Sequence, residues 1–280
     1  MREISARAIR DAVYQLVMDT AYTLPAGVKE ALRNALDRET SPRGRSALEL
    51  ILKNAEIAHD EKLAICQDCG LAVLFIEIGQ DVRIAGCNIR GAVDEAILEA
   101  YQDGYLRKSV CHPFTRSNTK TNTPAIIHYD IVPGQKVRIM FAAKGGGSEN
   151  MSRVVMLKPA DGKEGIINEV VKTVDIAGPN PCPPTIVGVG IGGDFELAAI
   201  MAKKAAVMRN PMDRNPDPEL AEMEDEMLER INRLGHGPQG LGGVMTSLGV
   251  NIMMHPCHIA SLPLAVNLQC VAARHKEVIL

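Results

Sequence analysis

At residues 71–78 the chain reads LAVLFIEI, a nearly continuous apolar run. A run of this length that lacks polar alternation is typical of a strand buried on both faces of a sheet. Upstream of it, apolar residues recur instead at helical spacing, in the segments 4–21, 28–38 and 46–60. We therefore predict a helical layer over residues 1–60, followed by a sheet whose first buried strand begins near residue 71.

Downstream of this strand the sequence mixes helical and strand-like segments. Two β-rich runs at 125–132 and 136–142 flank the turn-like stretch VPGQ, which predicts a hairpin. Further helices are expected at 90–106, 162–175, 194–208 and 217–234, further strands at 153–158 and 185–191, and an apolar helical tail at the C-terminus. We therefore expect one α+β domain over 1–280, with 61–280 as its core: a mixed, largely antiparallel sheet flanked by helices. Alternation after residue 150 leaves an α/β arrangement open.

The composition is that of an ordinary globular protein and excludes several classes of partner. The 280 residues are 46% hydrophobic and 23% charged, with a formal net charge of -3 and no block of lysine and arginine. Nucleic acid is therefore not an expected partner. No apolar run is long enough to cross a membrane, and the N-terminal segment lacks an apolar signal core, so we expect a cytoplasmic protein.

The seven cysteines are dispersed along the chain, which is typical of a reducing compartment and of metal-binding or buried thiols. Three of them sit in loop-like contexts: Cys66 in CQDCG, Cys182 in NPCPP and Cys270 in NLQC. Iron–sulfur clusters usually take four thiolates, so three would leave one iron open for Lewis-acid catalysis. The alternative is that these three are ordinary buried thiols.

A zinc site is a weaker interpretation of the motif Cys66-x-x-Cys69, because a structural zinc needs a second pair of ligands. The adjacent residues Cys257 and His258 could contribute, but neighbours in sequence rarely ligate one metal well. For the four remaining cysteines we expect small buried hydrophobic side chains: Cys69, Cys87, Cys111 and Cys257.

Three glycine-rich stretches stand out. GVGIGG at 188–193 matches the dinucleotide-binding pattern, with Asp213 about 20 residues on, which keeps a nicotinamide-dependent dehydrogenase as a distant alternative to a plain strand-to-helix turn. KGGGSEN at 144–150 lacks P-loop spacing, and its backbone amides either cradle a small carboxylate or form a flexible hairpin tip. The five glycines of 235–243 predict a loop that approaches something closely.

Taken together, these motifs resemble the N-terminal catalytic region, or α subunit, of class I fumarases and the related tartrate dehydratases. The resemblance covers nearly the whole chain from Cys66 onward, in the same order, and its motifs are highly specific. The matching stretches are CQD at 66–68, YLRKS at 105–109, NTPA at 122–125, KGGGSEN at 144–150, CPP at 182–184, GG at 192–193, GLGG at 240–243, HIASLP at 258–263, VNLQC at 266–270 and AAR at 272–274.

The resemblance implies a [4Fe-4S] cluster bound by Cys66, Cys182 and Cys270, whose fourth iron binds the substrate. It implies the α subunit of a hydro-lyase that interconverts fumarate and L-malate, with L-tartrate dehydration as the alternative. Single-chain members continue into a second domain, so a separate β subunit is the expected partner, with homodimers of α or αβ pairs. A non-catalytic interaction subunit stays a more distant alternative.

The resemblance and the chemistry together suggest roles for individual residues. Dehydration needs a positioned acid or base, and Asp68 is the candidate on this chain. Arg107 can grip a carboxylate of the dicarboxylate substrate through two hydrogen bonds. The other substrate-binding candidates are Gln67, Gly145, Gly146, Gly147 and His258. The family often has Thr where this chain has Cys69, which places a spare thiol beside the cluster.

Overall fold

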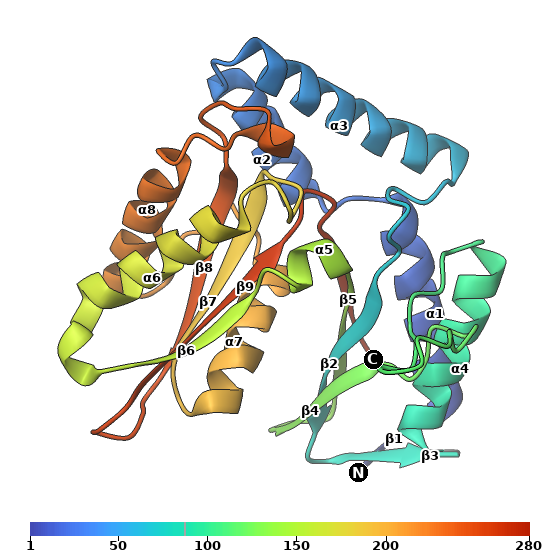
Figure 1. Cartoon of the computed structure of the whole chain (residues 1–280). Helices are drawn as coiled ribbons and strands as arrows, with labels where there is room; N and C mark the ends of the chain where they lie inside the picture. The colour runs from blue at the N-terminus through green and yellow to red at the C-terminus, as the bar shows by residue number, and fades with distance from the viewer. Residues whose placement is uncertain (87) are drawn as a thin grey trace. The chain divides into compact units, whose positions relative to one another are not determined.

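The structure is a computed structural model that describes residues 1–86 and 88–280. Its internal contacts divide the chain into two compact units: unit 1 comprises Met1–Pro25, Ala55–Gly146 and Arg274–Leu280, and unit 2 comprises Ala26–Asn54 and Gly147–Ala273. In the described residues each unit contains a four-stranded sheet (Figure 1), and the predicted mixed α+β class is confirmed. The single domain over 1–280, with 1–60 as a helical layer, stays a prediction.

The sheet of unit 1 has the strand order β10-β5-β2-β4. Its strands are β2 (Leu71–Gly79), β4 (Ile126–Val132), β5 (Val137–Lys144) and β10 (Arg274–Ile279). β2 is an interior strand, parallel to β4 and antiparallel to β5, and its residues 72–76 are buried as the apolar run predicts. A short parallel pair, β1 (Arg2–Ser5) and β3 (Val82–Ala85), belongs to the same unit.

The hairpin predicted from residues 125–132 and 136–142 is wrong, because β2 lies between β4 and β5. The turn after β4 crosses the end of β2 and bonds to it. The Gln80 N–H donates to the Val132 carbonyl and the Gly79 N–H to the Lys136 carbonyl, both at 2.8 Å. The turn between β4 and β5 therefore passes over the end of β2. A turn motif in the sequence is the same whether the two flanking strands pair directly, as in a hairpin, or on either side of another strand.

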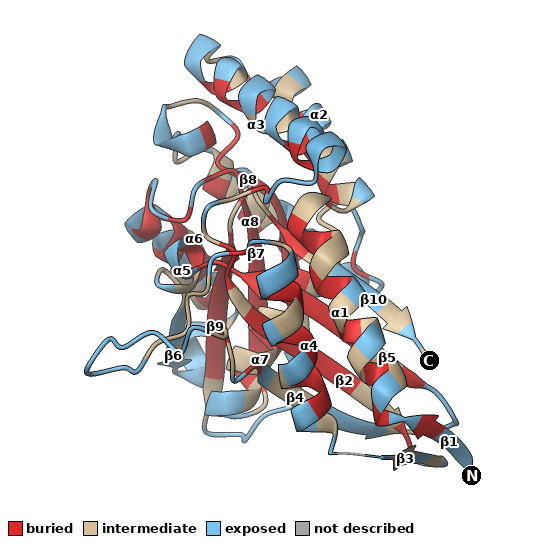
Figure 2. Cartoon of the chain, turned by 90° about the vertical axis from the view of Figure 1, so that its right-hand side faces the viewer, coloured by how far each residue is buried: buried red, intermediate tan, exposed pale blue. Residues whose placement is uncertain are grey.

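Two helices complete the core of unit 1. α1 (Ala6–Tyr22) and α4 (Ile89–Asp103) pack against each other, and α1 also contacts β5 and β10. Each helix begins at a side-chain cap, Ser5 for α1 and Asn88 for α4. Their apolar faces share one buried core with β2 and β5, visible as the red faces in Figure 2.

The sheet of unit 2 has the strand order β6-β9-β7-β8. Its strands are β6 (Arg153–Leu157), β7 (Thr185–Gly192), β8 (Ser247–His255) and β9 (Leu262–Gln269). One face shares a core with α6 (Gly162–Ala177) and α8 (Pro218–Asn232), and the other packs against α7 (Phe195–Met208). The remaining helical segments of the chain are α2 (Ala26–Arg38), α3 (Pro42–Glu61), α5 (Gly146–Glu149), η1 (Pro159–Asp161) and η2 (Pro238–Gly240).

The helical tail predicted for the C-terminus is wrong, because this region forms β9 and β10. β9 is an interior strand whose residues 263–269 are all buried. A strand buried on both faces has no polar alternation, so its apolar run also fits a buried helix. None of the described helices is both long enough and apolar enough to cross a membrane.

The glycines of the dinucleotide-like motif have a packing function in unit 2. A Cβ on Gly188 would lie 2.1 Å from the Ala202 carbonyl oxygen, and one on Gly190 would lie 2.0 Å from the Ala198 carbonyl oxygen. Both carbonyls belong to α7, so the absence of side chains lets this helix pack directly on β7. The close approach of a helix to a strand accounts for these two glycines without a nucleotide.

Candidate active site

The loop Cys66–Gly70 of unit 1 connects α3 to β2 and carries four of the residues that the sequence singles out. Cys66 is half-buried, and its Sγ donates to the Gln67 Oε1 at 3.4 Å. Gly70 has φ +79°, and a Cβ there would lie 2.8 Å from the backbone nitrogen of Lys144. The loop therefore lies directly against the end of β5, where the glycine-rich stretch begins.

Asp68 binds that glycine-rich stretch. Its Oδ1 accepts the Gly70 N–H at 3.0 Å, and its Oδ2 accepts the Gly146 N–H at 2.7 Å. A Cβ on Gly145 would lie 3.1 Å from the same Oδ2. The structure thus brings together Asp68, Gly145 and Gly146. Because the Gly146 N–H already donates to Asp68, a substrate carboxylate could accept from this amide only by replacing Asp68 as its acceptor.

Cys69 connects the loop to Arg107. Its Sγ accepts the Arg107 N–H at 3.2 Å and donates to the Cys66 carbonyl at 3.6 Å. Burial raises the pKa of the Cys69 thiol, which is 5% exposed, so the sulfur is a neutral donor and acceptor rather than a thiolate. The Arg107 side chain itself is exposed. Its backbone N–H is therefore held by Cys69, while its side chain is open to solvent.

Two buried residues that the functional interpretation of the sequence overlooked hold this arrangement in place. The Tyr101 hydroxyl donates to the Cys69 carbonyl at 2.8 Å, and burial raises the pKa of Tyr101 far above its ordinary value. Asn122, fully buried with φ +60°, donates to the Gly70 carbonyl at 3.2 Å and accepts the Ser109 N–H at 2.7 Å. The only sequence signal for either residue was the matching stretch NTPA.

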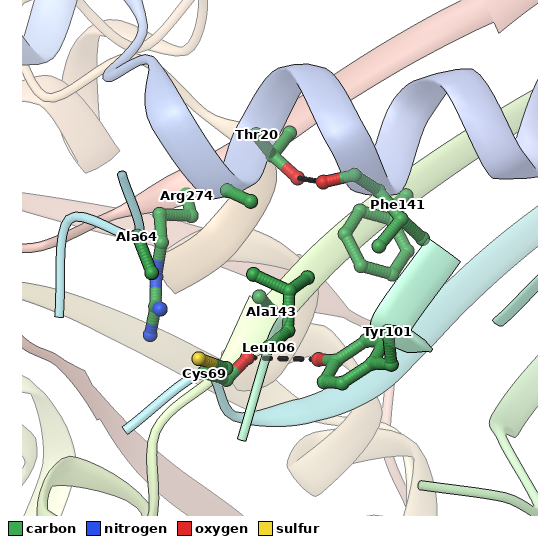
Figure 3. A pocket seen from close by; sticks show the side chains of 10 residues that line it. Thr20, Ala64, Cys69, Tyr101, Leu106, Phe141, Ala143 and Arg274 are labelled. Carbon is green, nitrogen blue, oxygen red and sulfur yellow. Dashed lines mark hydrogen bonds between the residues drawn. The ribbon is translucent and has the colours of Figure 1, made fainter. Parts of the chain in front are cut away.

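Behind the Cys66–Gly70 loop lies a small cavity of unit 1 (Figure 3). Cys69, Tyr101, Thr20 and Arg274 contribute polar groups to its lining, and the cavity has a volume of about 10 Å³. This is room for about one water molecule. The cavity is therefore part of the packing beneath the loop and is too small for a dicarboxylate.

In unit 2 the segments that carry Cys182 and Cys270 lie side by side. Cys182 is exposed and has φ +54°, and Cys270 is half-buried at the end of β9. The Val271 N–H donates to the Cys182 carbonyl at 3.2 Å. Two of the three predicted cluster ligands are thus joined through the backbone, while Cys66 belongs to unit 1.

The structure does not bring His258 to Cys270. His258 is exposed in the connection before β9, and Cys270 follows the last residue of β9. The eight residues of that strand span about 26 Å. Gly147, the third glycine of the candidate cradle, also belongs to unit 2, where a Cβ on it would lie 3.3 Å from the Asn180 carbonyl oxygen.

The remaining cysteines match the prediction of buried side chains only in part. Cys69 is buried as predicted, but Cys111 is half-buried and Cys257 is exposed, while Cys87 lies outside the described residues. In the described residues no group of three or more His, Cys, Asp and Glu side chains could hold a metal ion.

Comparison with known proteins shows the class of this chain. A family model described as "Fumarate hydratase (Fumerase)" matches residues 10–279. The chain therefore belongs to the family of class I fumarate hydratases and L-tartrate dehydratase α subunits. These are hydro-lyases, and an iron–sulfur cluster is a property of the family.

Several relatives are named as L(+)-tartrate dehydratase α subunits. The chain is 42% identical over 272 residues to a Methanocaldococcus jannaschii protein named "Putative L(+)-tartrate dehydratase subunit alpha", with 95% of each chain covered. It is 33% identical over 255 residues to the L(+)-tartrate dehydratase subunit alpha of Escherichia coli strain UTI89, covering 90% of this chain and 84% of the relative. The Shigella sonnei protein of the same name is 32% identical over 255 residues.

Proposed function

We propose that this chain is the α subunit of an iron–sulfur L(+)-tartrate dehydratase. The observation that carries the proposal is the 42% identity to the Methanocaldococcus jannaschii protein over 95% of both chains. Hydration of fumarate to L-malate, which the sequence analysis placed first, becomes the second candidate. The description of the matching family model as a fumarate hydratase favours it.

The donor set of the chain fits an iron–sulfur cluster. Thiolates are the ligands that such clusters prefer, and the Cys182 and Cys270 segments are already joined by the Val271–Cys182 hydrogen bond. Cys66 would be the third ligand. Cys66, Cys182 and Cys270 would hold the cluster, which would supply a Lewis acid for departure of the substrate hydroxyl.

The side chains of unit 1 supply binding and proton transfer in this proposal. Arg107, whose backbone is fixed by Cys69, binds a substrate carboxylate through its guanidinium. Asp68 has both oxygens oriented by backbone amides, and each oxygen keeps a second lone pair with which it can take a proton. Gln67 is exposed beside Asp68 and orients the substrate. We also assign Gly145, Gly146 and Gly147 to substrate binding. His258 stays a prediction from the family resemblance, because the length of β9 separates it from Cys270.

The assembled enzyme includes a β subunit in this proposal, because the relatives are named as α subunits. The deciding experiment is an anaerobic assay of the chain co-expressed with its β subunit, with L-tartrate and fumarate compared under the same conditions. We expect L-tartrate to be dehydrated to oxaloacetate with the higher kcat/KM. A higher kcat/KM for fumarate would select the second candidate, and no turnover of either acid would reject both.

A further inference from the structure

One face of β9 carries polar side chains toward its end. Side chains alternate along a strand, so Leu264, Val266 and Leu268 share the core with α6 and α8, whereas Ala265 packs on α7. Asn267 and Gln269 follow Ala265 at the same spacing and lie on the α7 face. They are 5% and 0% exposed.

The two amides differ in their partners. The Asn267 Nδ2 donates to Glu149 Oε2 at 3.1 Å, and Glu149 in turn pairs with Lys203. Gln269 has no such connection: both its Oε1 and its Nε2 are buried without a hydrogen-bond partner among the described residues. Buried amides in folded proteins are almost always hydrogen-bonded, because an unpaired one loses its water without compensation. The partner of Gln269 is therefore a group that the described chain does not itself contain.

Gln269 directly precedes Cys270, whose other neighbour, Val271, donates to the Cys182 carbonyl at 3.2 Å. Gln269 is thus the residue immediately before Cys270, one candidate cluster ligand. It is also two residues before Val271, which contacts Cys182, the second candidate ligand. We propose that the Gln269 side-chain N–H donates a hydrogen bond to a sulfur of the cluster bound at Cys182 and Cys270. This rests on the proposed function. Hydrogen bonds to cluster sulfurs raise the reduction potential, and here the bond also helps to retain the cluster.

The substitution Gln269→Leu keeps the size of the side chain and removes its amide, so the proposal predicts effects of opposite sign in the two states of the full chain. Without the cluster, the variant should unfold at a higher urea concentration than the wild type, because an unpaired buried amide has been removed. After anaerobic reconstitution, it should lose iron about fivefold faster than the wild type, the ratio that one ordinary hydrogen bond provides. Its cluster should also have a lower reduction potential.

Asn215 supplies the matched control, because it is a buried amide of the same unit that does have partners. Its Nδ2 donates to Glu224 Oε1 at 2.8 Å and to the Ile252 carbonyl at 3.1 Å. Asn215→Leu should lower the urea midpoint and leave iron loss unchanged. A lowered midpoint in Gln269→Leu would show that water or protein already pairs the amide, and unchanged iron loss would show that the cluster is not its partner. Either result would reject the Gln269 hydrogen bond and leave the proposed cofactor standing. A wild-type chain that binds no iron would reject both.

Discussion

At the scale of single residues, Cys69 shows how one buried side chain fixes the groups on both sides of a candidate site. Its sulfur accepts the Arg107 N–H and donates to the Cys66 carbonyl. One of these neighbours is the candidate carboxylate-binding residue and the other is a candidate cluster ligand. The thiol that looks superfluous in the sequence therefore holds the two segments together within unit 1.

Removing this sulfur should loosen Arg107 more than it disturbs the fold. In Cys69→Ala the Arg107 N–H loses its acceptor, and we expect a roughly tenfold higher KM with a smaller change in kcat, together with a loss of about 1–3 kcal/mol in unfolding free energy. Cys69→Ser keeps a donor and acceptor and should recover part of both. Steady-state kinetics of the assembled enzyme and urea unfolding of the chain measure these effects, with Cys257→Ser, which removes an exposed thiol, as the control.

The raised pKa of Cys69 adds a pH signature to the same prediction. Above the ordinary thiol pKa of about 8.5, the unfolded chain loses a proton that the buried thiol retains, so wild-type stability should fall as pH rises. Cys69→Ser has no thiol to ionise, and its stability should fall less over this range. Equal pH dependence in both proteins, or equal KM values in Cys69→Ala and the wild type, would contradict the positioning role.

At the scale of elements, sequence periodicity located most helices and the buried strand β2 but not the pairing of the strands. Helical spacing depends on neighbours within a few residues, which the sequence displays directly. The predictions for the turn after β4 and for the tail β9–β10 failed for a different reason, because these structures depend on strands far away in the chain. The turn depends on β2, β9 pairs with β7, and β10 pairs with β5. The prediction for the five-glycine loop at 235–243 was correct only in part. Its composition predicted a close contact but did not indicate which residue is contacted.

That contact is Glu39, at the end of α2 in unit 2. Its side chain is 3% exposed, and its oxygens accept the backbone N–H groups of Thr40, Ser41, Val244 and Met245 at 2.8–3.1 Å. Gly243 has φ +135°, and a Cβ on it would lie 2.4 Å from Glu39 Oε1, so both the backbone conformation and the space favour glycine at that position. One carboxylate thus joins the helix end to the glycine loop.

Glu39→Ala should therefore destabilise the chain by about 2–4 kcal/mol, because one buried and three part-buried backbone amides lose their acceptor together. Equilibrium urea unfolding measures the change. Glu30→Ala removes an exposed carboxylate from the same helix and should cost less than about 0.5 kcal/mol. If the two variants were equally stable, the amides around Glu39 would have to be satisfied in some other way, and the proposed connection would be rejected.

At the scale of the whole molecule, the sequence indicated candidate residues for the chemistry better than it indicated what supports them. Asp68, Arg107 and the glycines were recognisable because their motifs are short and chemically distinctive. Tyr101 and Asn122 act through hydrogen bonds to carbonyls remote in sequence, and Gln269 stands out only because its amide is buried without a partner among the described residues. No local pattern reveals either feature. The Cys182 and Cys270 segments, 88 positions apart by their numbers, meet only because β7 and β9 pair in one sheet.

The proposed β subunit would supply catalytic groups that this chain lacks. Asp68 is the single acid–base candidate that the sequence indicated here, and dehydration needs a proton removed from carbon as well as a hydroxyl expelled. Purified alone and reconstituted without air, the chain should bind iron but turn over L-tartrate only at background rate, and added β subunit should restore activity. In that assembled enzyme Asp68→Asn should lower kcat by roughly 10²–10⁴ with iron content unchanged, the usual effect of removing a proton-transfer group. Full activity of the chain without its partner would instead place the complete catalytic machinery on these 280 residues.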